Sequence, residues 1–361
     1  MEVGIMGLPG AGKTTIFNAL AQQRAEVGGF GSTEAHRAAV KVPDPRLTRL
    51  SEMFRPEKTT PAEVRYVDVA GGLSAGGEAK AAQLIGQLRT ADELVHVVRA
   101  FESDTFPHPK GSVDPKRDLA EMNADLALAD LAVVERRLDR LERELRMGKA
   151  APNNPQWREL ELLEQFKPTL ESGGAIRDLE LADADRKLLR PYGFLTEKPM
   201  LVLLNTGDDA SAADPVIAQL EPDANERSVD VAALAGRLEM ELGELDEAER
   251  REFMAELGIE ELGLGRIIGL SYRLLDLISF FTVGEDECRA WTVRRNAPAV
   301  DAAGQIHSDI QRGFIRAEVV RYEDLVGTGG LAEARKAGVL RQEGKTYQVQ
   351  DGDVIHFLFN V

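Results

Sequence analysis

Short apolar runs alternate with amphipathic stretches along much of the chain. The apolar runs have the length of buried strands, and we expect strands at residues 3–6, 38–42, 64–67, 93–101, 198–205 and 228–233. Apolar residues three and four positions apart predict helices at residues 15–20, 46–53, 79–90, 246–257 and 264–278. Alternating strands and helices are typical of a doubly wound α/β domain with a parallel sheet. We therefore predict such a domain, interrupted by an insertion.

The insertion has a different hydrophobic pattern. From residue 118 to 147 the chain predicts one long helix, in which a heptad row is formed by Leu131, Val134, Leu138, Leu141 and Leu145. Residues 148–155 break this helix, and a second helix is indicated by Trp157, Leu160, Leu163, Phe166 and Leu170. The two helices predict an antiparallel hairpin that forms an arm. The row is equally compatible with ordinary packing and with recognition of a partner.

After residue 280 the pattern changes to short strands separated by turn residues. We expect strands at residues 289–293, 315–320, 346–349 and 354–359, with a turn at 350–353. This predicts a small α+β module at residues 278–361. The α/β domain then consists of residues 1–114 and 193–277, and the arm of residues 115–192.

The composition limits the class of protein and the cellular compartment that we expect. The chain has 361 residues, 43% of them hydrophobic, which allows two or three domains with ordinary cores. No apolar run approaches the ~20 residues of a membrane span, and we expect neither a signal peptide nor membrane association. Cys288 is the only cysteine, which fits a reducing cytoplasm. The net charge of −17 opposes non-specific binding to nucleic acid, and DNA is not an expected partner.

The first strand runs directly into a glycine-rich loop. Residues 7–14 match the pattern G-x-x-x-x-G-K-[ST], and a helix follows. Backbone N–H groups and the helix N-terminus would cradle a polyphosphate, Lys13 would reach its β- and γ-phosphates, and the Thr14 hydroxyl would bind Mg²⁺. We expect nucleotide contacts from Gly7, Pro9, Gly10, Ala11, Gly12, Lys13, Thr14 and Thr15.

Two further segments have the spacing of nucleotide-sensing switches. Ser32 and Thr33 are candidates for a hydroxyl that contacts Mg²⁺ in the first switch. Asp68-Val69-Ala70-Gly71 follows a strand and matches the D-x-x-G of a second switch. Asp68 would hold Mg²⁺ through water, and the N–H of Gly71 would meet the γ-phosphate.

The base-reading segment is expected after the strand that ends near residue 205. Asn205-Thr206-Gly207-Asp208 occupies the place of the Asn-Lys-x-Asp motif of G domains. Asn205 can serve either purine through its amide, whereas Asp208 suits the N1–H and 2-amino donors of guanine, which adenine lacks. Thr206 stands in place of the lysine. The residues alone therefore leave ATP and GTP open.

Together with these motifs, the tail of the chain resembles that of the YchF-type (Obg-like) ATPases. The resemblance covers essentially the whole chain and is most specific at residues 289–293, 306–309, 313–319 and 349–357, with further similarity at 43–47, 96–99 and 126–131. It implies a P-loop NTPase (G) domain, an inserted helical arm and a ubiquitin-like TGS domain at the C-terminus. It also implies ATP hydrolysis in preference to GTP hydrolysis and association with the ribosome, either its large subunit or the whole particle. The TGS domain and the arm would contact RNA or protein.

Several residues depart from that family's pattern. The family lacks the catalytic glutamine after D-x-x-G, and here Gly72 offers no side chain at all. A family histidine proposed to act in hydrolysis matches His108, which would position water or act as a general base; a solvated loop histidine fits equally well. Gly10 replaces an asparagine linked to monovalent cations, which leaves K⁺ dependence open. Asp208 replaces a glutamate.

The leading hypothesis is a slow, Mg²⁺-dependent purine nucleoside triphosphatase with Lys13 and His108 as catalytic residues. ATP is the favoured substrate and GTP a possible one, and the protein would act as a nucleotide-switched, ribosome-associated regulator. The alternatives are a nucleotide-binding interaction module with little or no hydrolysis and a true GTP-specific GTPase. A metabolic kinase would need an acceptor-binding lid and a catalytic base that the sequence does not show.

Overall fold

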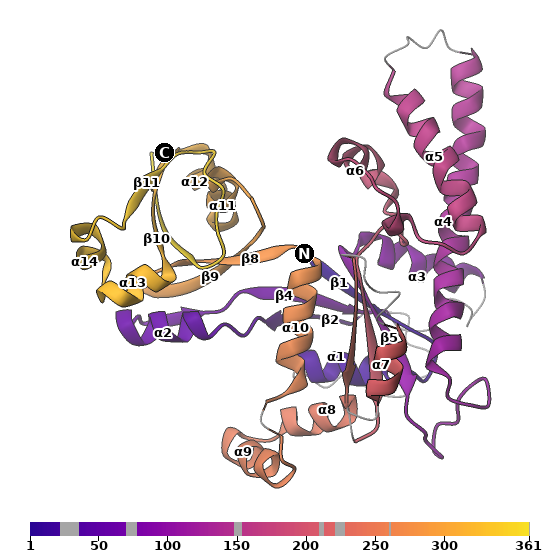
Figure 1. The fold of residues 1–361 in the computed structure, drawn as a ribbon, viewed down its shortest axis with the longest axis horizontal. Helices are drawn as coiled ribbons and strands as arrows, with labels where there is room; N and C mark the ends of the chain where they lie inside the picture. The colour runs from indigo at the N-terminus through magenta and orange to yellow at the C-terminus, as the bar shows by residue number, and fades with distance from the viewer. Residues whose placement is uncertain are drawn as a thin grey trace. The chain divides into compact units, whose positions relative to one another are not determined.

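The computed structural model describes residues 1–21, 36–69, 78–147, 154–208, 213–220, 228–259 and 261–360. Ser32, Thr33 and Gly71 lie outside these residues. The chain divides into two compact units, Met1–Ala38 with Arg65–Ile267 and Ala39–Val64 with Ile268–Val361 (Figure 1). Residues 39–64 thus belong to the same unit as the C-terminal residues, although the sequence pattern shows no boundary there.

A six-stranded sheet runs through the first unit in the order β2-β4-β1-β5-β6-β7. The strands from β4 to β7 in this order pair in parallel. Their bounds, with that of β2, are β1 Glu2–Met6, β2 His36–Lys41, β4 Glu63–Asp68, β5 Glu93–Ala100, β6 Met200–Thr206 and β7 Val229–Leu234. Parallel strands that are apolar throughout need cover on both faces. The predicted doubly wound α/β domain is confirmed.

The helices of this domain are α1 Lys13–Ala21, α3 Glu78–Thr90, α7 Asp214–Leu220, α8 Gly236–Glu244, α9 Glu247–Glu256 and α10 Gly263–Leu274. One hydrophobic cluster joins the sheet to the neighbouring helices through Leu94, Val98, Val202, Leu88 and Met122. α10 ends at Leu274, so the predicted helix to residue 278 is wrong at its end. Asp276 has a left-handed φ of 52°, and the chain then enters strand β8.

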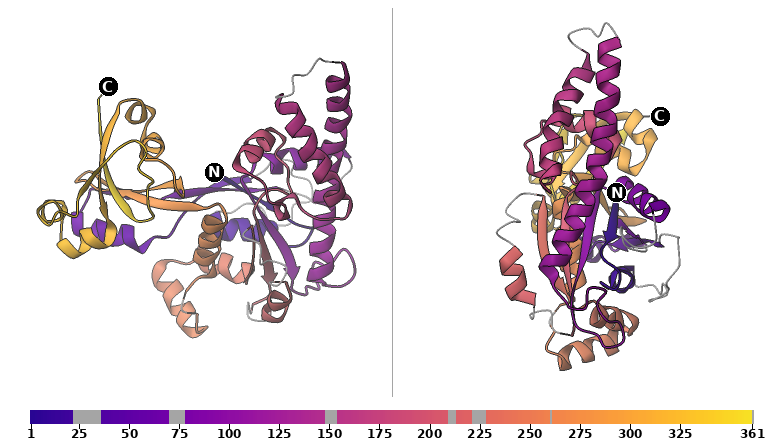
Figure 2. Two further views of the ribbon diagram at one scale, coloured as in Figure 1. Left: turned by 45° about the horizontal axis from the view of Figure 1, so that its top comes forward. Right: turned by 90° about the vertical axis from the view of Figure 1, so that its right-hand side faces the viewer.

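The insertion forms the predicted pair of antiparallel helices, α4 Pro115–Met147 and α5 Pro155–Glu171, which lie side by side in Figures 1 and 2. Asn154 caps α5, because its side chain accepts a hydrogen bond from the backbone of Gln156. The two helices share one core, to which Val134, Leu138 and Leu141 contribute from α4 and Leu163, Phe166 and Leu170 from α5. Short helices η1 Ile176–Asp178, α6 Asp183–Leu189 and η2 Arg190–Tyr192 lead back to β6.

A buried carboxylate fixes the arm to the α/β domain. Asp130 of α4 is fully buried, and its Oδ1 lies 3.0 Å from Nη1 of Arg89 at the end of α3. Its Oδ2 accepts hydrogen bonds from the backbone and hydroxyl of Thr196 at 2.8 and 2.9 Å. Breaking a buried pair of this kind is costly, so these contacts anchor α4 near its middle. No helix in the described part of the chain is long and apolar enough to cross a bilayer.

The second unit is built on another six-stranded sheet, in the order β11-β10-β12-β8-β9-β3. Its strands are β3 Lys58–Thr60, β8 Leu277–Thr282, β9 Glu287–Arg294, β10 Phe314–Arg321, β11 Arg341–Glu343 and β12 Asp353–Phe359. The helices are α2 Pro45–Phe54, α11 Ala299–Ile306, α12 Ser308–Arg312, α13 Tyr322–Thr328 and α14 Leu331–Lys336. The edge strand β3 comes from far upstream and pairs in parallel with β9.

The predicted strand at residues 346–349 is wrong. Only Gln348 forms an isolated bridge, to Pro298. The backbone N–H of Tyr347 donates to the carbonyl of Gly344 at 3.1 Å, which closes a turn in place of a strand. The turn residues therefore override the local preference for extended structure.

One arginine of helix α2 makes a charge pair and a cation–π contact with this part of the unit. Nη1 of Arg46 lies 2.8 Å from a carboxylate oxygen of Asp351, and Nη2 lies 2.8 Å from Asp44, the N-cap of α2. The same guanidinium lies over the ring of Phe281, 5.2 Å from its centre. These contacts combine a charge pair with a cation–π interaction, and the pair with Asp351 joins residues 305 positions apart in the sequence.

Candidate nucleotide-binding site

The loop between β1 and α1 has the backbone of a phosphate-binding loop, and two of its glycines are required by close neighbours. A Cβ atom on Gly7 would lie 2.3 Å from the carbonyl oxygen of Val97, and one on Gly12 would lie 2.1 Å from Nδ2 of Asn205. Gly12 also has a left-handed φ of 91°. The strand–loop–helix arrangement predicted from the sequence is therefore present, with α1 beginning at Lys13.

Lys13 is buried at the centre of this loop. Its Nζ donates to the carbonyls of Gly7 and Leu8, both at 3.1 Å. Burial lowers the pKa of Lys13 to about 8, although the carboxylate of Asp68 acts in the opposite direction. A poorly solvated ammonium group at the N-terminus of a helix attracts an anion.

Asp68 and Thr14 form the part of the site that can accept a metal ion. The Thr14 hydroxyl donates to Oδ2 of Asp68 at 2.8 Å. Within the described residues, the buried Oδ1 of Asp68 has no hydrogen-bond partner. Burial raises the pKa of Asp68, against the effects of Thr14 and Lys13. A carboxylate and a hydroxyl fit Mg²⁺, which binds one or two protein oxygens and completes its shell with phosphate and water.

Asn205, in β6, links the phosphate loop to the start of α8. Its Nδ2 donates to the carbonyl of Ala11 at 2.9 Å, and its Oδ1 accepts from the backbone of Gly236 at 3.2 Å. The amide therefore fixes two backbone segments. Gly236, at the start of α8, is a contact that the sequence analysis missed, because nothing local marks it as a partner of Asn205.

The other two residues of this motif differ in exposure. Thr206 is buried, and its hydroxyl donates to the carbonyl of Gly207 at 3.3 Å. Asp208 is exposed, just beyond the end of β6. An exposed carboxylate at this end of a parallel sheet can reach a ligand bound at the carboxyl ends of the strands.

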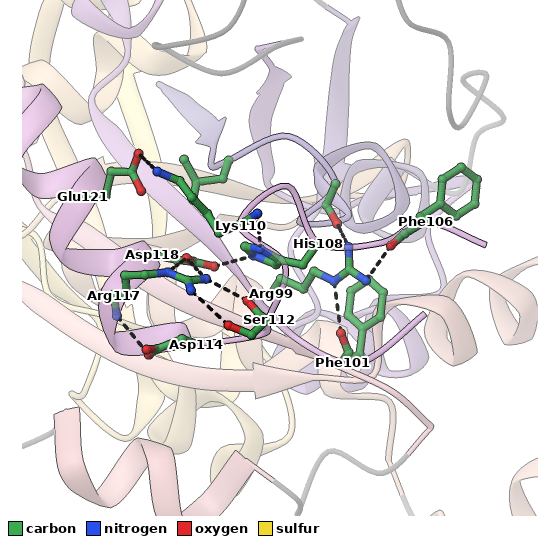
Figure 3. A network of polar contacts seen from close by, with 12 residues as sticks. Arg99, Phe101, Phe106, His108, Lys110, Ser112, Asp114, Arg117, Asp118 and Glu121 are labelled. Carbon is green, nitrogen blue, oxygen red and sulfur yellow. Dashed lines mark hydrogen bonds and ion pairs between the residues drawn. The ribbon is translucent and has the colours of Figure 1, made fainter. Parts of the chain in front are cut away.

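His108 is held inside its own loop (Figure 3). Its Nε2 lies 2.8 Å from Oδ2 of Asp118, and its Nδ1 accepts from the backbone N–H of Lys110 at 3.1 Å. Because Nδ1 is an acceptor, the proton of the neutral ring is on Nε2 and points to Asp118. Arg117 pairs with the other oxygen of Asp118 at 2.8 Å. Both ring nitrogens are thus engaged, and the proposed catalytic role, which stays a prediction, requires His108 to leave this pair.

The sequence and the fold match known proteins over the whole chain. A family model described as a 50S ribosome-binding GTPase matches residues 2–136, and a YchF-GTPase C-terminal model, described as a protein of unknown function, matches residues 277–360. The chain is similar to the "Ribosome-binding ATPase YchF" of Bacillus subtilis strain 168, with 41% identity over 369 residues and 100% of both chains covered.

Two further relatives show the same similarity over the full length of the chain. The protein of the same name in Escherichia coli O157:H7 is 40% identical over 364 residues, with 100% of this chain and 99% of the relative covered. The solved structure of the Schizosaccharomyces pombe YchF GTPase superposes with a TM-score of 0.83 at 28% identity, covering 99% of this chain and 97% of the other. On the strength of the site geometry, full-length identity and shared fold, this chain belongs to the YchF family.

Proposed function

We propose that this chain is a Mg²⁺-dependent purine nucleoside triphosphatase that favours ATP and acts as a nucleotide-switched regulator associated with the ribosome, in the cytoplasm. The observation that carries the proposal is the joint arrangement of Lys13, Thr14 and Asp68 around a glycine loop that Asn205 clamps. The names of the bacterial relatives, which describe a ribosome-binding ATPase, support the choice of nucleotide and partner.

The chemistry of this site is mainly electrostatic. The Lys13 ammonium, the N–H groups of residues 7–14 and the N-terminus of α1 would stabilise negative charge on the γ-phosphoryl group as the β–γ phosphoanhydride bond breaks. Asp68 and Thr14 would hold Mg²⁺, which neutralises charge on the β- and γ-oxygens. Ser32, Thr33 and Gly71 are proposed to complete this shell from the two switches. Gly72 provides no side chain to orient water, so we expect slow intrinsic turnover.

The preference between ATP and GTP depends on Asn205, Thr206 and Asp208. The Asn205 amide can serve either purine. Asp208 suits the N1–H and 2-amino donors of guanine, which adenine lacks, so this residue alone favours GTP, while the names of the relatives favour ATP. Calorimetric titration with MgATP and MgGTP side by side measures the preference directly.

Charge is distributed unequally between the two units. The 361 residues contain 44 Lys and Arg and 61 Asp and Glu. The second unit contains 16 basic and 17 acidic residues, so almost all of the net charge of −17 lies in the first unit. Repulsion from a polyanion is therefore weakest at the second unit. We propose that this unit, as a TGS-like domain, contacts RNA or protein at the ribosome, together with the arm.

The proposal is tested by ATP turnover of the unmodified protein and of Lys13→Ala, each with and without purified ribosomes. We expect slow turnover that ribosomes change, and loss of turnover in Lys13→Ala because the buried cation at the γ-phosphoryl group is removed. Normal hydrolysis by Lys13→Ala would contradict the proposal.

A second candidate function is a nucleotide-binding module with little or no hydrolysis. The specific observation in its favour is that both ring nitrogens of His108 are engaged, by Asp118 and by the backbone of Lys110. It predicts tight binding of MgATP with no product formed in either condition. The same experiment therefore separates the two candidates.

A further inference from the structure

Arg99 is a buried cation beside the phosphate loop that the function described so far does not use. It lies near the end of β5 and is 2% exposed. Its Nε donates to the carbonyl of Phe101 at 3.0 Å and its Nη2 to that of Phe106 at 2.7 Å. Nη1 lies 3.5 Å from the carbonyl of Gly10 in the phosphate loop. Figure 3 shows the guanidinium between these segments, above the ring of Phe101.

The partners of Arg99 leave its charge uncompensated. In the described part of the chain its guanidinium has no carboxylate within ion-pair distance, and its polar contacts are with backbone carbonyls. By contrast, Arg89, Arg117 and Arg137 of the same unit each pair with an acidic side chain. Buried charges are normally paired. A polyphosphate in the neighbouring loop would supply the missing negative charge.

Gly10 lies next to the guanidinium of Arg99. A Cβ atom built on Gly10 would lie 3.4 Å from Nη1 of Arg99, and the φ of this residue is 77°. Any longer side chain would therefore extend from a point already in contact with the guanidinium. The cation thus lies directly against the phosphate loop, and the left-handed φ rather than a lack of space favours glycine at this position.

The contacts of Arg99 also reach the segment that carries His108. The carbonyl of Phe106, two residues before His108, accepts from Arg99, while His108 itself is bonded to Asp118 at the start of α4. Residues 101–114 are thus held at one end by Arg99 and at the other by α4. Arg99 is the side chain that joins this segment to the phosphate loop.

We propose that Arg99 is a positioning residue for the triphosphate: the polyphosphate compensates its charge, and its guanidinium in turn holds residues 101–114 against the phosphate loop. The proposal rests on nucleotide binding at that loop, as proposed above. It predicts that a bound triphosphate strengthens the contacts of Arg99 and slows backbone opening of residues 101–114. A diphosphate, with less charge next to the loop, has a smaller effect.

The first test uses the unmodified protein and needs no substitution. Hydrogen–deuterium exchange of residues 101–114 is measured without nucleotide, with MgADP and with a non-hydrolysable MgATP analogue. We expect exchange to slow in that order. Equal exchange in the free and triphosphate-bound protein would overturn the inference about Arg99, whereas failure of the protein to bind either nucleotide would overturn the proposed function itself.

The second test separates the charge of Arg99 from its geometry. Arg99→Lys keeps the charge, but its single nitrogen cannot span the three carbonyls that Nε, Nη1 and Nη2 of the guanidinium reach separately; we expect MgATP affinity within about threefold of the unmodified protein, at least about tenfold lower kcat, and loss of the exchange protection. Arg99→Met removes the charge and is expected to weaken MgATP binding by at least about tenfold and MgADP binding by less.

The matched control is Arg117→Lys, which alters an arginine that contacts the same segment from α4 and is paired with Asp118. We expect it to leave the ratio of MgATP to MgADP affinity unchanged. An unchanged ratio in a folded Arg99→Met protein, or full exchange protection in Arg99→Lys, would overturn the proposal. Thermal unfolding of each variant establishes that it is folded.

Discussion

Replacing Gly12 by alanine tests the geometry of the phosphate loop most directly. The new Cβ would lie 2.1 Å from Nδ2 of Asn205, far inside van der Waals contact, and the residue would keep a left-handed φ of 91°. Asn205 cannot simply rotate away, because its amide holds both Ala11 and Gly236. The substitution therefore displaces either the phosphate loop or strand β6, which carries Asn205.

The expected magnitude follows from these contacts. A non-glycine residue in the left-handed region costs about 1–2 kcal/mol. Displacing Asn205 removes two hydrogen bonds worth about 1 kcal/mol each and leaves their buried partners unsatisfied. The total of about 3–5 kcal/mol is an expected loss of stability. MgATP affinity should fall as well, because the N–H groups of the displaced loop no longer point at the phosphates.

The assay is calorimetric titration with MgATP, combined with urea unfolding. Gly258→Ala is the matched control, because Gly258 has a φ of 68° and open space around its Cβ position. It should show only the backbone cost of about 1 kcal/mol in stability and unchanged affinity. If Gly12→Ala bound MgATP as tightly as Gly258→Ala does, the contact between Asn205 and the loop would not be the one described.

Three further predictions concern charge. The pKa of Lys13 is lowered from 10.5 to about 8, so between these values the unfolded chain holds more protons than the folded one, and stability rises with pH. Urea unfolding should show Lys13→Met more stable than the unmodified protein at pH 7, by up to ~3 kcal/mol, with the difference disappearing toward pH 10. Asp208→Asn should weaken MgGTP binding by about tenfold and leave MgATP binding unchanged, because adenine lacks the N1–H and 2-amino donors that guanine offers the carboxylate; equal effects on both nucleotides would contradict this. Arg46→Ala should lower the free energy of unfolding by about 1–3 kcal/mol, whereas Arg49→Ala, whose exposed pair with Glu52 is i,i+3, should change it by less than about 0.5 kcal/mol.

Much of the fold was predictable because its signals are local. The loop from Gly7 to Thr14 has a fixed spacing, and the leucine row of α4 repeats every few residues, so both are visible in a short window of sequence. The ends of elements were less predictable. Asp276 interrupts helical periodicity with a left-handed residue, and β8 forms because β9 and β12 are available to pair with it.

The parts of the site that escaped prediction depend on distant contacts. Asn205 was expected to read a base, but its bonds to Ala11 and Gly236 join residues 194 and 31 positions away. His108 was considered either as a catalytic residue or as a solvated loop histidine, whereas the structure buries it and pairs it with Asp118 at the start of α4. Arg99 looked like part of an apolar strand, and only the structure places it beside Gly10.

Strand β3 has a consequence for how the C-terminal residues can be studied. A fragment that starts at Ile268 would carry β8 to β12 but not Lys58–Thr60, which pair with Glu287, Cys288 and Arg289. The outer edge of β9 would then be bare, and an unpaired strand edge invites self-association. Expressed alone, this portion should aggregate more readily than a version to which residues 39–64 are linked, because the compact unit is made of two segments that are separate in the sequence.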